Sequence, residues 1–461
     1  MMILKDKSVL VLGLGETGLS MLRYLGAQGA RLRAADSRSA PPGLAEAKKY
    51  VAESRIHCGP FSDELFSGVE LIAISPGVPL RDPAVARAVA SGIAVLGDIE
   101  LFAQSLPQGN LRPRVLAITG SNGKTTVTSM VEHLCRTAGK DVVAAGNISP
   151  AVLDVVLQRG VNQPRVWVLE LSSFQLETTY SLSADAATVL NVSEDHLDRY
   201  AGLAEYSDAK ARIFAGCGVQ VLNRDDARCM SMARKDGKTV TFGLSEPGSA
   251  NDFGIESSGR DIWLKQGEQR LLKAGEMQVT GLHNGANALA ALALCRAIDI
   301  PLPALIDALR SFRGLPHRVE RVAEIGGITY YDDSKGTNVG ATVAALQGLG
   351  CKAVLIAGGE GKGQDFAPLN PVVSQHARAV VLIGRDAPII AAALAGCGIK
   401  VARAEDMSDA VHQAARLAQS GDAVLLSPAC ASFDMFRNYQ HRAEMFVQAV
   451  HDLGKECAWH H

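Results

Sequence analysis

The sequence lacks several features that define whole classes of protein. No apolar run approaches the roughly 18–20 residues of a membrane span. No block of like charge occurs, and the 46 basic and 48 acidic residues leave a net charge of −2. A membrane or a nucleic acid is therefore not an expected partner. At the start, Lys5-Asp6-Lys7 leads straight into an apolar segment, which predicts no cleavable signal.

Paired cysteines are also missing. The nine cysteines are odd in number, scattered, and contain no Cys-x-x-Cys pair. This pattern indicates reduced, mostly packing residues of a cytoplasmic protein, without a disulfide framework or a metal cage. The 461 residues suggest about three domains, and 47% hydrophobic with 20% charged residues is ordinary for a soluble globular protein.

One motif dominates what is present. Residues 118–126 read Ile-Thr-Gly-Ser-Asn-Gly-Lys-Thr-Thr, directly after the apolar run 115–118, and a helical pattern follows up to a stop at Gly139. In such loops backbone N–H groups surround phosphates, a lysine (Lys124) reaches the outer oxygens, and a hydroxyl (Thr125) binds Mg²⁺. The full Walker A pattern would have glycine at position 118, where Ile118 stands. An ordinary strand–turn–helix with a solvated lysine is the alternative.

The chain divides into three α/β blocks, predicted at 1–97, 98–314 and 315–461. Strands alternating with helical patterns predict mostly parallel sheets covered on both faces. The polar stretch 104–114 is expected to be a linker. Expected strands lie at 9–12, 32–35, 71–74 and 94–96 in the first block, and at 142–145, 166–171, 187–190 and 219–222 in the second.

Two regions should depart from this alternation. Residues 239–280 predict a small antiparallel addition, before a helix at 286–298. The third block should open with a hairpin, 319–325 and 328–331, around Gly326-Gly327. Its expected parallel strands are 353–356, 379–383 and 423–426, and its clearest helices are 408–418 and 442–453.

A second glycine loop, Gly13-Leu14-Gly15-Glu16-Thr17-Gly18, follows the first strand, and Asp36 ends the next one. Taken alone, this pattern indicates a dinucleotide cofactor and a dehydrogenase. A glycine turn without a ligand is also possible. Because a helix N-terminus attracts any diphosphate, the second nucleotide loop downstream favours a nucleotide-linked substrate.

Three further residues could take part in chemistry. Glu170 ends a buried-looking strand beside the phosphate loop, where a carboxylate can position Mg²⁺, although it could be an exposed strand-end acid. His196 follows the strand 187–190 at the same sheet edge, and a structural role is equally possible. Lys210 on spacing alone resembles a solvated helix lysine.

Taken together, several segments resemble the Mur ligases, which build the peptide of bacterial cell-wall precursors. The segments, in order, are 119–126, 170–177, 191–200, 283–287, 314–320 and 332–338. The resemblance covers essentially the whole chain. Asp-Ser-Lys-Gly-Thr-Asn at 333–338 and residues 427–434 are similar to the branch that adds D-glutamate, and the Asp-Asn-Pro-Arg signature of the diaminopimelate adders is absent.

The resemblance implies an ATP-dependent acid–D-amino-acid ligase. It would join D-glutamate to UDP-N-acetylmuramoyl-L-alanine through an acyl phosphate and a tetrahedral intermediate, releasing ADP and phosphate, in a cytoplasmic step of peptidoglycan synthesis. The implied fold is a Rossmann-like N-terminal domain, a central P-loop-type ATP domain and a Rossmann-like C-terminal domain. Two Mg²⁺ sites, carbamylation of Lys210 by CO₂ and a monomer are implied. Closure of the third domain on the second is expected.

The resemblance also implies roles for individual residues. The catalytic residues would be Lys124, Glu170, His196 and Lys210. The metal residues would be Thr125, Glu170, His196 and, if carbamylated, Lys210. The ATP residues would be Gly120, Ser121, Asn122, Gly123, Lys124, Thr125, Thr126, Asn284, Asn287, Arg318 and Asp333. The residues for the UDP-substrate would be Gly15, Thr17, Asp36, Ser37, Ser75, Asn147, Ser172 and His196.

D-glutamate would contact Thr337, Lys362, Ser432, Phe433 and Tyr439. Two of these depart from the family, which more often has Leu at Phe433 and Phe at Tyr439. The departures matter little if backbone amides make the contacts. Glu360 stands where Asp is expected and is left out of the predicted site.

Overall fold

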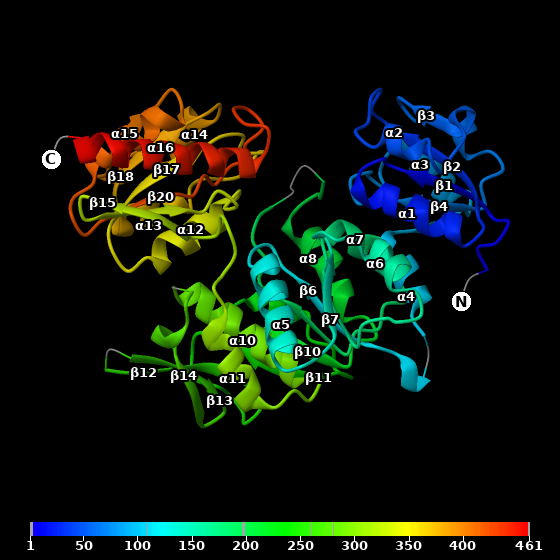
Figure 1. Cartoon of the computed structure of the whole chain (residues 1–461), viewed down its shortest axis with the longest axis horizontal. Coiled ribbons are helices and arrows are strands. Elements are labelled where there is room, and N and C mark those ends of the chain that lie inside the picture. Colours follow the sequence, from blue (N-terminus) through cyan, green and yellow to red (C-terminus); the bar gives the residue numbers. More distant parts are fainter. Residues whose placement is uncertain (1–2, 108, 196–198, 260, 280, 460–461) are drawn as a thin grey trace.

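The computed structural model describes residues 3–107, 109–195, 199–259, 261–279 and 281–459, and these form three α/β bodies. Figure 1 shows the N-terminal body in blue and the C-terminal body in yellow to red, on different sides of the cyan and green central body. The described residues build sheets of five, nine and six strands. The predicted fold class, three α/β domains with mostly parallel sheets, is confirmed.

The N-terminal sheet is parallel throughout, in the order β3-β2-β1-β4-β5. Its strands are β1 (Ser8–Leu12), β2 (Arg31–Asp36), β3 (Ile56–Cys58), β4 (Leu71–Ile74) and β5 (Ala94–Leu96), with helices α1 (Glu16–Ala27), α2 (Leu44–Ala47) and α3 (Pro83–Ala90). Side chains alternate along β1: Val9 and Val11 pack with the α1 side, Leu10 and Leu12 with the α3 side. The short β3 was not predicted, because three residues carry too little periodicity.

The central sheet has the order β14-β13-β12-β11-β10-β9-β6-β8-β7. Its strands are β6 (Arg114–Thr119), β7 (Val142–Gly146), β8 (Val166–Glu170), β9 (Ala186–Val189), β10 (Val219–Asn223), β11 (Lys238–Phe242), β12 (Phe253–Ser258), β13 (Asp261–Gln266) and β14 (Gln269–Lys273). Among the described residues of this sheet, antiparallel pairing is confined to β12, β13 and β14. The prediction for 239–280 was therefore wrong at its start, because β11 pairs parallel with β10.

Two layers of helices cover this sheet. They are α4 (Asp98–Ser105), α5 (Lys124–Thr137), α6 (Val152–Arg159), α7 (Ser173–Glu177), α8 (Leu203–Ala211), α9 (Ala227–Ser231), α10 (Leu282–Arg296) and α11 (Leu302–Ser311). Leu116 and Ile118 of β6 share a core with α5, α10 and α11, whereas Val115 and Ala117 share one with α4, α6 and α8. This alternation fixes β6, and hence the phosphate loop that follows it, between two packed layers.

The C-terminal sheet has the order β15-β16-β20-β17-β18-β19 and is parallel except at β15. Its strands are β15 (Glu320–Ile325), β16 (Ile328–Asp332), β17 (Ala353–Gly358), β18 (Ala377–Ile383), β19 (Lys400–Arg403) and β20 (Ala423–Leu426). The helices are α12 (Val339–Gly348), α13 (Leu369–His376), α14 (Ala387–Ala393), α15 (Met407–Leu417) and α16 (Tyr439–Trp459). The predicted hairpin turn is present, with positive φ at Gly326 (60°) and Gly327 (76°).

The N-terminal and central bodies are joined by polar contacts. Arg23 on α1 makes two bonds to Asp154 on α6, at 2.7 and 2.6 Å. Ser149 Oγ donates to Glu16 Oε1 at 2.7 Å, beside the N-terminal glycine loop. No described helix is long and apolar enough to cross a membrane.

Helix α4, which follows the expected boundary at Gly97, packs on the central body. Phe102 meets Trp167 edge-on at 4.8 Å between ring centroids. Asp98, at the start of the helix, is 2% exposed; its Oδ2 accepts from Gln175 Nε2 at 3.0 Å, and among described residues its Oδ1 has no partner. Burial raises the pKa of Asp98 to about 6.

This carboxyl gives a pH-dependent contribution to stability. The folded pKa of Asp98, about 6, lies above the ordinary value of 3.8, so the folded chain binds the proton more tightly. The stabilisation is fully present below the unfolded pKa and is lost as pH rises through the folded pKa. Asp98→Asn cannot titrate. Between about pH 4 and about pH 7 its free energy of unfolding should therefore gain about 2 kcal/mol relative to wild type. Parallel urea titrations measure this, and a difference that stays constant with pH would contradict it.

Candidate functional site

The phosphate loop runs from the end of β6 to the start of α5. Gly120 and Gly123 adopt φ of 154° and 82°, conformations that side chains disfavour. A Cβ on Gly123 would meet Asn287 Oδ1 at 2.8 Å. The loop geometry expected from the sequence is therefore present, with Lys124 and Thr125 as the first two residues of the helix.

The segment after β9 holds this loop in place. Ser121 N donates to Asn191 O at 2.9 Å, and Ser121 Oγ donates to Ser193 O at 2.9 Å. Asn122 N donates to Asn191 Oδ1 at 2.8 Å, and Asn191 Nδ2 returns a bond to Asn122 O at 3.1 Å. Asn191 and Ser193 were not among the predicted site residues, although they lie in the segment 191–200 that contains His196.

Two lysine amines converge on the loop. Lys124 Nζ donates to the carbonyls of Gly120 and Ser121 at 2.7 and 2.8 Å. Lys210 Nζ, on α8, donates to the same Gly120 carbonyl at 2.9 Å and lies 4.3 Å from the Tyr206 ring centroid. The Lys210 side chain is buried, with the residue 1% exposed. Burial, with the nearby charge of Lys124, holds the pKa of Lys210 well below its usual range. The solvated position that spacing alone favoured is not the one that Lys210 adopts, because α8 turns its side chain inward.

Glu170, at the end of β8, supplies a carboxylate to this cationic group. It is 2% exposed, and its Oε1 accepts from Asn147 Nδ2 at 2.9 Å. Its Oε2 is buried without a partner among the described residues. The charge of Glu170 opposes the lowering of the Lys124 pKa that burial causes. An unpaired carboxylate oxygen facing cations and a phosphate loop is a donor suited to a hard divalent ion.

The remaining predicted metal residues are less fully defined. Thr125 lies in the first turn of α5 and is partly exposed, next to the buried Thr126. His196 lies outside the described residues. The donor set of Glu170 and Thr125 fits a magnesium ion at the loop, because oxygen ligands are what Mg²⁺ prefers.

Helix α10 brings two predicted ATP residues to the loop. Asn284 is 8% exposed, and Asn287 Nδ2 donates to Asn284 Oδ1 at 3.2 Å. The approach of Asn287 to Gly123 places this pair beside the first turn of α5. Both asparagines lie in the first two turns of α10, which begins at Leu282 and not at the predicted residue 286.

The C-terminal body contributes the two remaining predicted ATP residues, Arg318 and Asp333. Burial raises the pKa of Asp333 to about 7, while the Ser427 hydroxyl, 2.6 Å away, and the charge of Arg318 act in the opposite direction. Burial lowers the pKa of Arg318, and the charges of Asp333 and Glu170 oppose this. The C-terminal body faces the central loop, because Lys362 Nζ lies 3.7 Å from Asp195 Oδ1 and Asn338 Nδ2 donates to Asn122 Oδ1 at 2.9 Å.

The predicted D-glutamate residues follow the carboxyl ends of three neighbouring parallel strands, β16, β17 and β20. Lys362 Nζ lies 3.7 Å from Asp195 Oδ1 of the central body. Ser432 is 3% exposed, Phe433 is 71% exposed, and Tyr439 begins α16. Thr337 is partly buried in the turn before α12. The Phe433 ring is largely exposed to solvent, so burial does not constrain which side chain stands there.

Residues predicted for the UDP-substrate lie in two places. Gly15, Thr17, Ser37 and Ser75 lie at the carboxyl ends of the N-terminal strands, and Asn147 and Ser172 lie beside Glu170. The Asp36 carboxylate accepts from Leu14 N at 2.7 Å and from Arg38. Burial raises its pKa, but the bonds from Arg38 and Leu14 bring it below its ordinary value. These bonds hold the Asp36 carboxylate beside the N-terminal glycine loop.

Sequence reasoning missed two cationic residues of the C-terminal body. Burial and the charge of Arg318 lower the pKa of Lys335 to about 8, and its Nζ lies 4.0 Å from the Tyr439 ring centroid. Arg442, fully buried on α16, donates to Ser334 Oγ, Ser334 O and Cys430 O at 3.0, 2.7 and 3.0 Å. Lys335 could have been found from the sequence, because it lies within the recognised segment Asp-Ser-Lys-Gly-Thr-Asn. Arg442 lies in none of the recognised segments, so no sequence pattern pointed to it.

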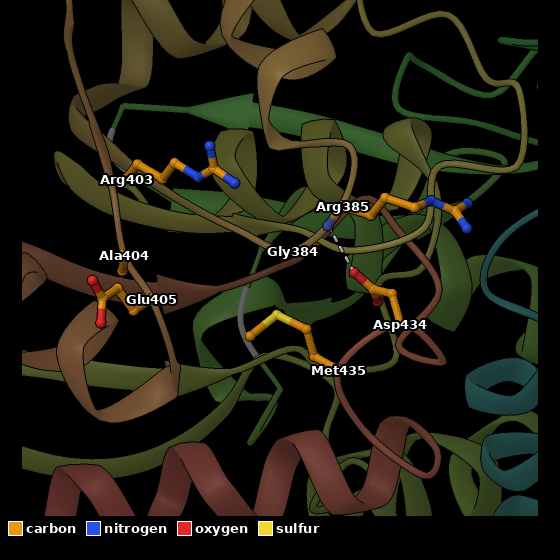
Figure 2. A pocket seen from close by; sticks show the side chains of 7 residues that line it. All are labelled: Gly384, Arg385, Arg403, Ala404, Glu405, Asp434 and Met435. Carbon is orange, nitrogen blue, oxygen red and sulfur yellow. Dashed lines mark hydrogen bonds between the residues drawn. The ribbon is translucent and has the colours of Figure 1, made fainter.

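The predicted site does not coincide with an adjacent cavity of about 820 Å³ in the C-terminal body. Figure 2 shows Arg385 and Asp434 on one side of this cavity, and Arg403 and Glu405 on the other. Asp434 Oδ2 accepts from the Arg385 backbone at 2.8 Å, which anchors the segment after Phe433 to the end of β18. None of the predicted site residues lines this cavity.

The fold and site are those of an α/β enzyme that uses a nucleotide: they combine three bodies with a phosphate loop, a buried lysine and an unpaired carboxylate. Comparisons with known proteins identify the family. The Mur ligase MurD-like N-terminal domain matches residues 7–97, the Mur ligase middle domain 118–295, and the Mur ligase glutamate ligase domain 317–430. The chain belongs to the Mur ligase family.

Relatives match almost end to end. The UDP-N-acetylmuramoylalanine--D-glutamate ligase of Nitrosomonas europaea is 57% identical, over 96% of each chain. The enzyme of the same name from Methylobacillus flagellatus is 57% identical, over 99% of each chain.

Solved structures show the same fold at low identity. UDP-N-acetylmuramate-alanine ligase MurC from Thermotoga maritima has a TM-score of 0.60 and 20% identity, covering 96% of this chain and 99% of that one. MurF from Acinetobacter baumannii has a TM-score of 0.58 and 16% identity, covering 96% and 91%.

Proposed function

We propose that the chain adds D-glutamate to UDP-N-acetylmuramoyl-L-alanine with hydrolysis of ATP to ADP and phosphate. The observation that carries this is the near-complete, 57% identical match to ligases of that name. The geometry supports it, because Glu170 ends β8 beside the strand that opens into the phosphate loop, and the C-terminal body contacts the central body at that loop through Asn338–Asn122 and nearby through Lys362–Asp195.

The chemistry fits these groups. A carboxylate is a poor acyl donor, and its approach to the γ-phosphate brings two anions together. The Lys124 ammonium neutralises part of this charge at the outer phosphate oxygens. Transfer of the phosphoryl group gives an acyl phosphate and ADP. The neutral D-glutamate amine then attacks the carbonyl carbon and forms the C–N bond of a tetrahedral intermediate. The C=O double bond re-forms as the bond to phosphate breaks, phosphate leaves, and the nitrogen gives up a proton.

The metal ions are proposed to sit on oxygen and imidazole donors around the loop. Thr125 and Glu170 would hold one, and His196 a second together with Lys210 after carbamylation. Bound Mg²⁺ supplies charge neutralisation between carboxylate and phosphate. The unpaired Oε2 of Glu170 supports this assignment. The neutral amine favoured at Lys210 is the form that adds CO₂, giving an N-linked carboxylate and a proton.

The substrates are proposed to span the bodies. The UDP end would contact Gly15, Thr17, Asp36, Ser37 and Ser75, and the muramoyl end Asn147, Ser172 and His196. D-glutamate would contact Thr337, Lys362, Ser432, Phe433 and Tyr439.

We place the domain boundaries at 1–97, 98–314 and 315–461; the packing of α4 on the central body supports the first. The enzyme would act in the cytoplasm, where ATP is available, and as a monomer.

A phosphate-release assay tests this function. Release is expected only when ATP, Mg²⁺, UDP-N-acetylmuramoyl-L-alanine and D-glutamate are all present, because each supplies a group that the reaction consumes or stabilises. Equal turnover with L-alanine or diaminopimelate in place of D-glutamate would contradict the assignment. ATP binding without substrate-dependent turnover would indicate a regulator. A substrate-dependent absorbance change with NAD(P)H would restore the dehydrogenase interpretation.

A further inference from the structure

A pair of asparagine side chains connects the C-terminal body to the phosphate loop. Asn338 Nδ2 donates to Asn122 Oδ1 at 2.9 Å, across 216 positions of sequence. Asn338 is 5% exposed. Two residues further on, a Cβ at Gly340 would come within 3.0 Å of Asn122 Nδ2 and 3.2 Å of Ser193 Oγ. The two bodies therefore meet closely at the loop itself.

Neighbouring bonds fix the orientation of both amides. Asn338 Oδ1 caps α12 by accepting from Ala341 N at 2.9 Å, so its Nδ2 is the group left to face the central body. Asn122 is held through its backbone by Asn191, and its Nδ2 lies 3.4 Å from Ser193 Oγ. Its Oδ1 is therefore directed at Asn338. The contact joins two groups that are each already anchored.

We propose that Asn338 is a positioning residue that docks the C-terminal body on the phosphate loop and thereby places D-glutamate against the activated carboxylate. This rests on the proposed function. Thr337, the preceding residue, is a proposed D-glutamate contact, and Lys362 of the same body reaches Asp195. Docking at Asn122 therefore sets the distance between the D-glutamate amine and the activated carboxylate. A misplacement of about 1 Å can cost about 10²-fold in rate.

The variant Asn338→Ser separates docking from helix capping. Serine is about as good a cap as asparagine, so α12 stays capped, but its hydroxyl is too short to reach Asn122. We expect kcat/KM for D-glutamate to fall roughly tenfold, the factor expected for one lost hydrogen bond of about this strength. KM for the UDP-substrate and the melting temperature should stay unchanged, because the UDP-substrate contacts and the cap remain.

The partner variant completes a double-mutant cycle. Asn122→Ser removes the acceptor of the bridge but keeps the backbone bonds to Asn191. Because Asn122 is also a predicted ATP residue, Asn122→Ser can carry a loss of its own. The double variant should nevertheless be no worse than the more affected single variant, since both changes break the same contact. Additive losses, or an Asn338→Ser protein with wild-type kinetics, would overturn the inference. So would a loss that appears equally in KM for the UDP-substrate. A wild-type chain that releases no phosphate with D-glutamate would overturn the proposed function instead.

Discussion

Replacing Lys210 by alanine is expected to lower phosphate release by 10²–10³-fold, the range for loss of one charge-stabilising group, and small carboxylates should restore part of it. Lys210 is 1% exposed and its Nζ lies 2.9 Å from the Gly120 carbonyl, at the base of the phosphate loop. Burial and the charge of Lys124 lower its pKa, so the amine is readily neutral and can add CO₂. Alanine removes the resulting carboxylate and leaves space that acetate or formate can enter.

The rescue distinguishes the carbamate from a simple lysine cation. Lys210→Arg keeps a positive charge and fills the space, so it should be inactive and should not respond to carboxylates. Lys238→Ala, which changes an exposed lysine on β11, should resemble wild type. Rates measured against acetate and formate concentration give the answer. A Lys210→Ala protein that folds normally, binds Mg²⁺, and shows no rescue would argue against carbamylation.

The predictable parts of this protein are those whose information is local. The phosphate loop follows from nine consecutive residues, and each long buried strand shows as an apolar run. Glu170 and Lys124 could be brought together from sequence because β6 and β8 are parallel neighbours whose carboxyl ends share one edge. Strand ends were placed within one or two residues.

What the sequence did not show depends on contacts between distant segments. Lys210 appears solvated on spacing, yet α8 packs it against β6 and the loop, 90 positions away. Arg442 links Ser334 and Cys430, and Asn338 reaches Asn122 from another body; neither bond leaves a pattern in nearby residues. The strand β19 was not predicted: it is short and mostly exposed at a sheet edge, so its apolar signal is weak.

Glu170→Gln is expected to reduce turnover by 10²–10³-fold and to raise the Mg²⁺ concentration needed for half-maximal rate at least about tenfold. Glutamine keeps the shape and the acceptor for Asn147 Nδ2, so the local fold should persist. It replaces Oε2, which is buried and unpartnered among the described residues, by an amide nitrogen that cannot bind a cation. The substitution should therefore weaken Mg²⁺ binding without disturbing the packing around residue 170.

The same substitution removes the anion that four cationic groups share. The charge of Glu170 raises the pKa of Lys124, Lys210, Lys335 and Arg318 against the lowering that burial causes. Without it, the pKa of Lys335, about 8 in the wild-type chain, should fall towards neutrality. A lysine is a cation only below its pKa. Residual activity that depends on the protonated Lys335 amine should therefore be lost at a lower pH in Glu170→Gln than in the wild-type protein.

A matched carboxylate provides the control for both effects. Glu177, seven residues along, accepts from Tyr200 OH at 2.6 Å and has no role in the proposed metal site. Glu177→Gln should leave the Mg²⁺ dependence and the pH profile of phosphate release unchanged. If Glu170→Gln shows wild-type Mg²⁺ dependence while Glu177→Gln does not, the metal site lies on the α7 side of the loop and Glu170 serves only to balance the buried cations.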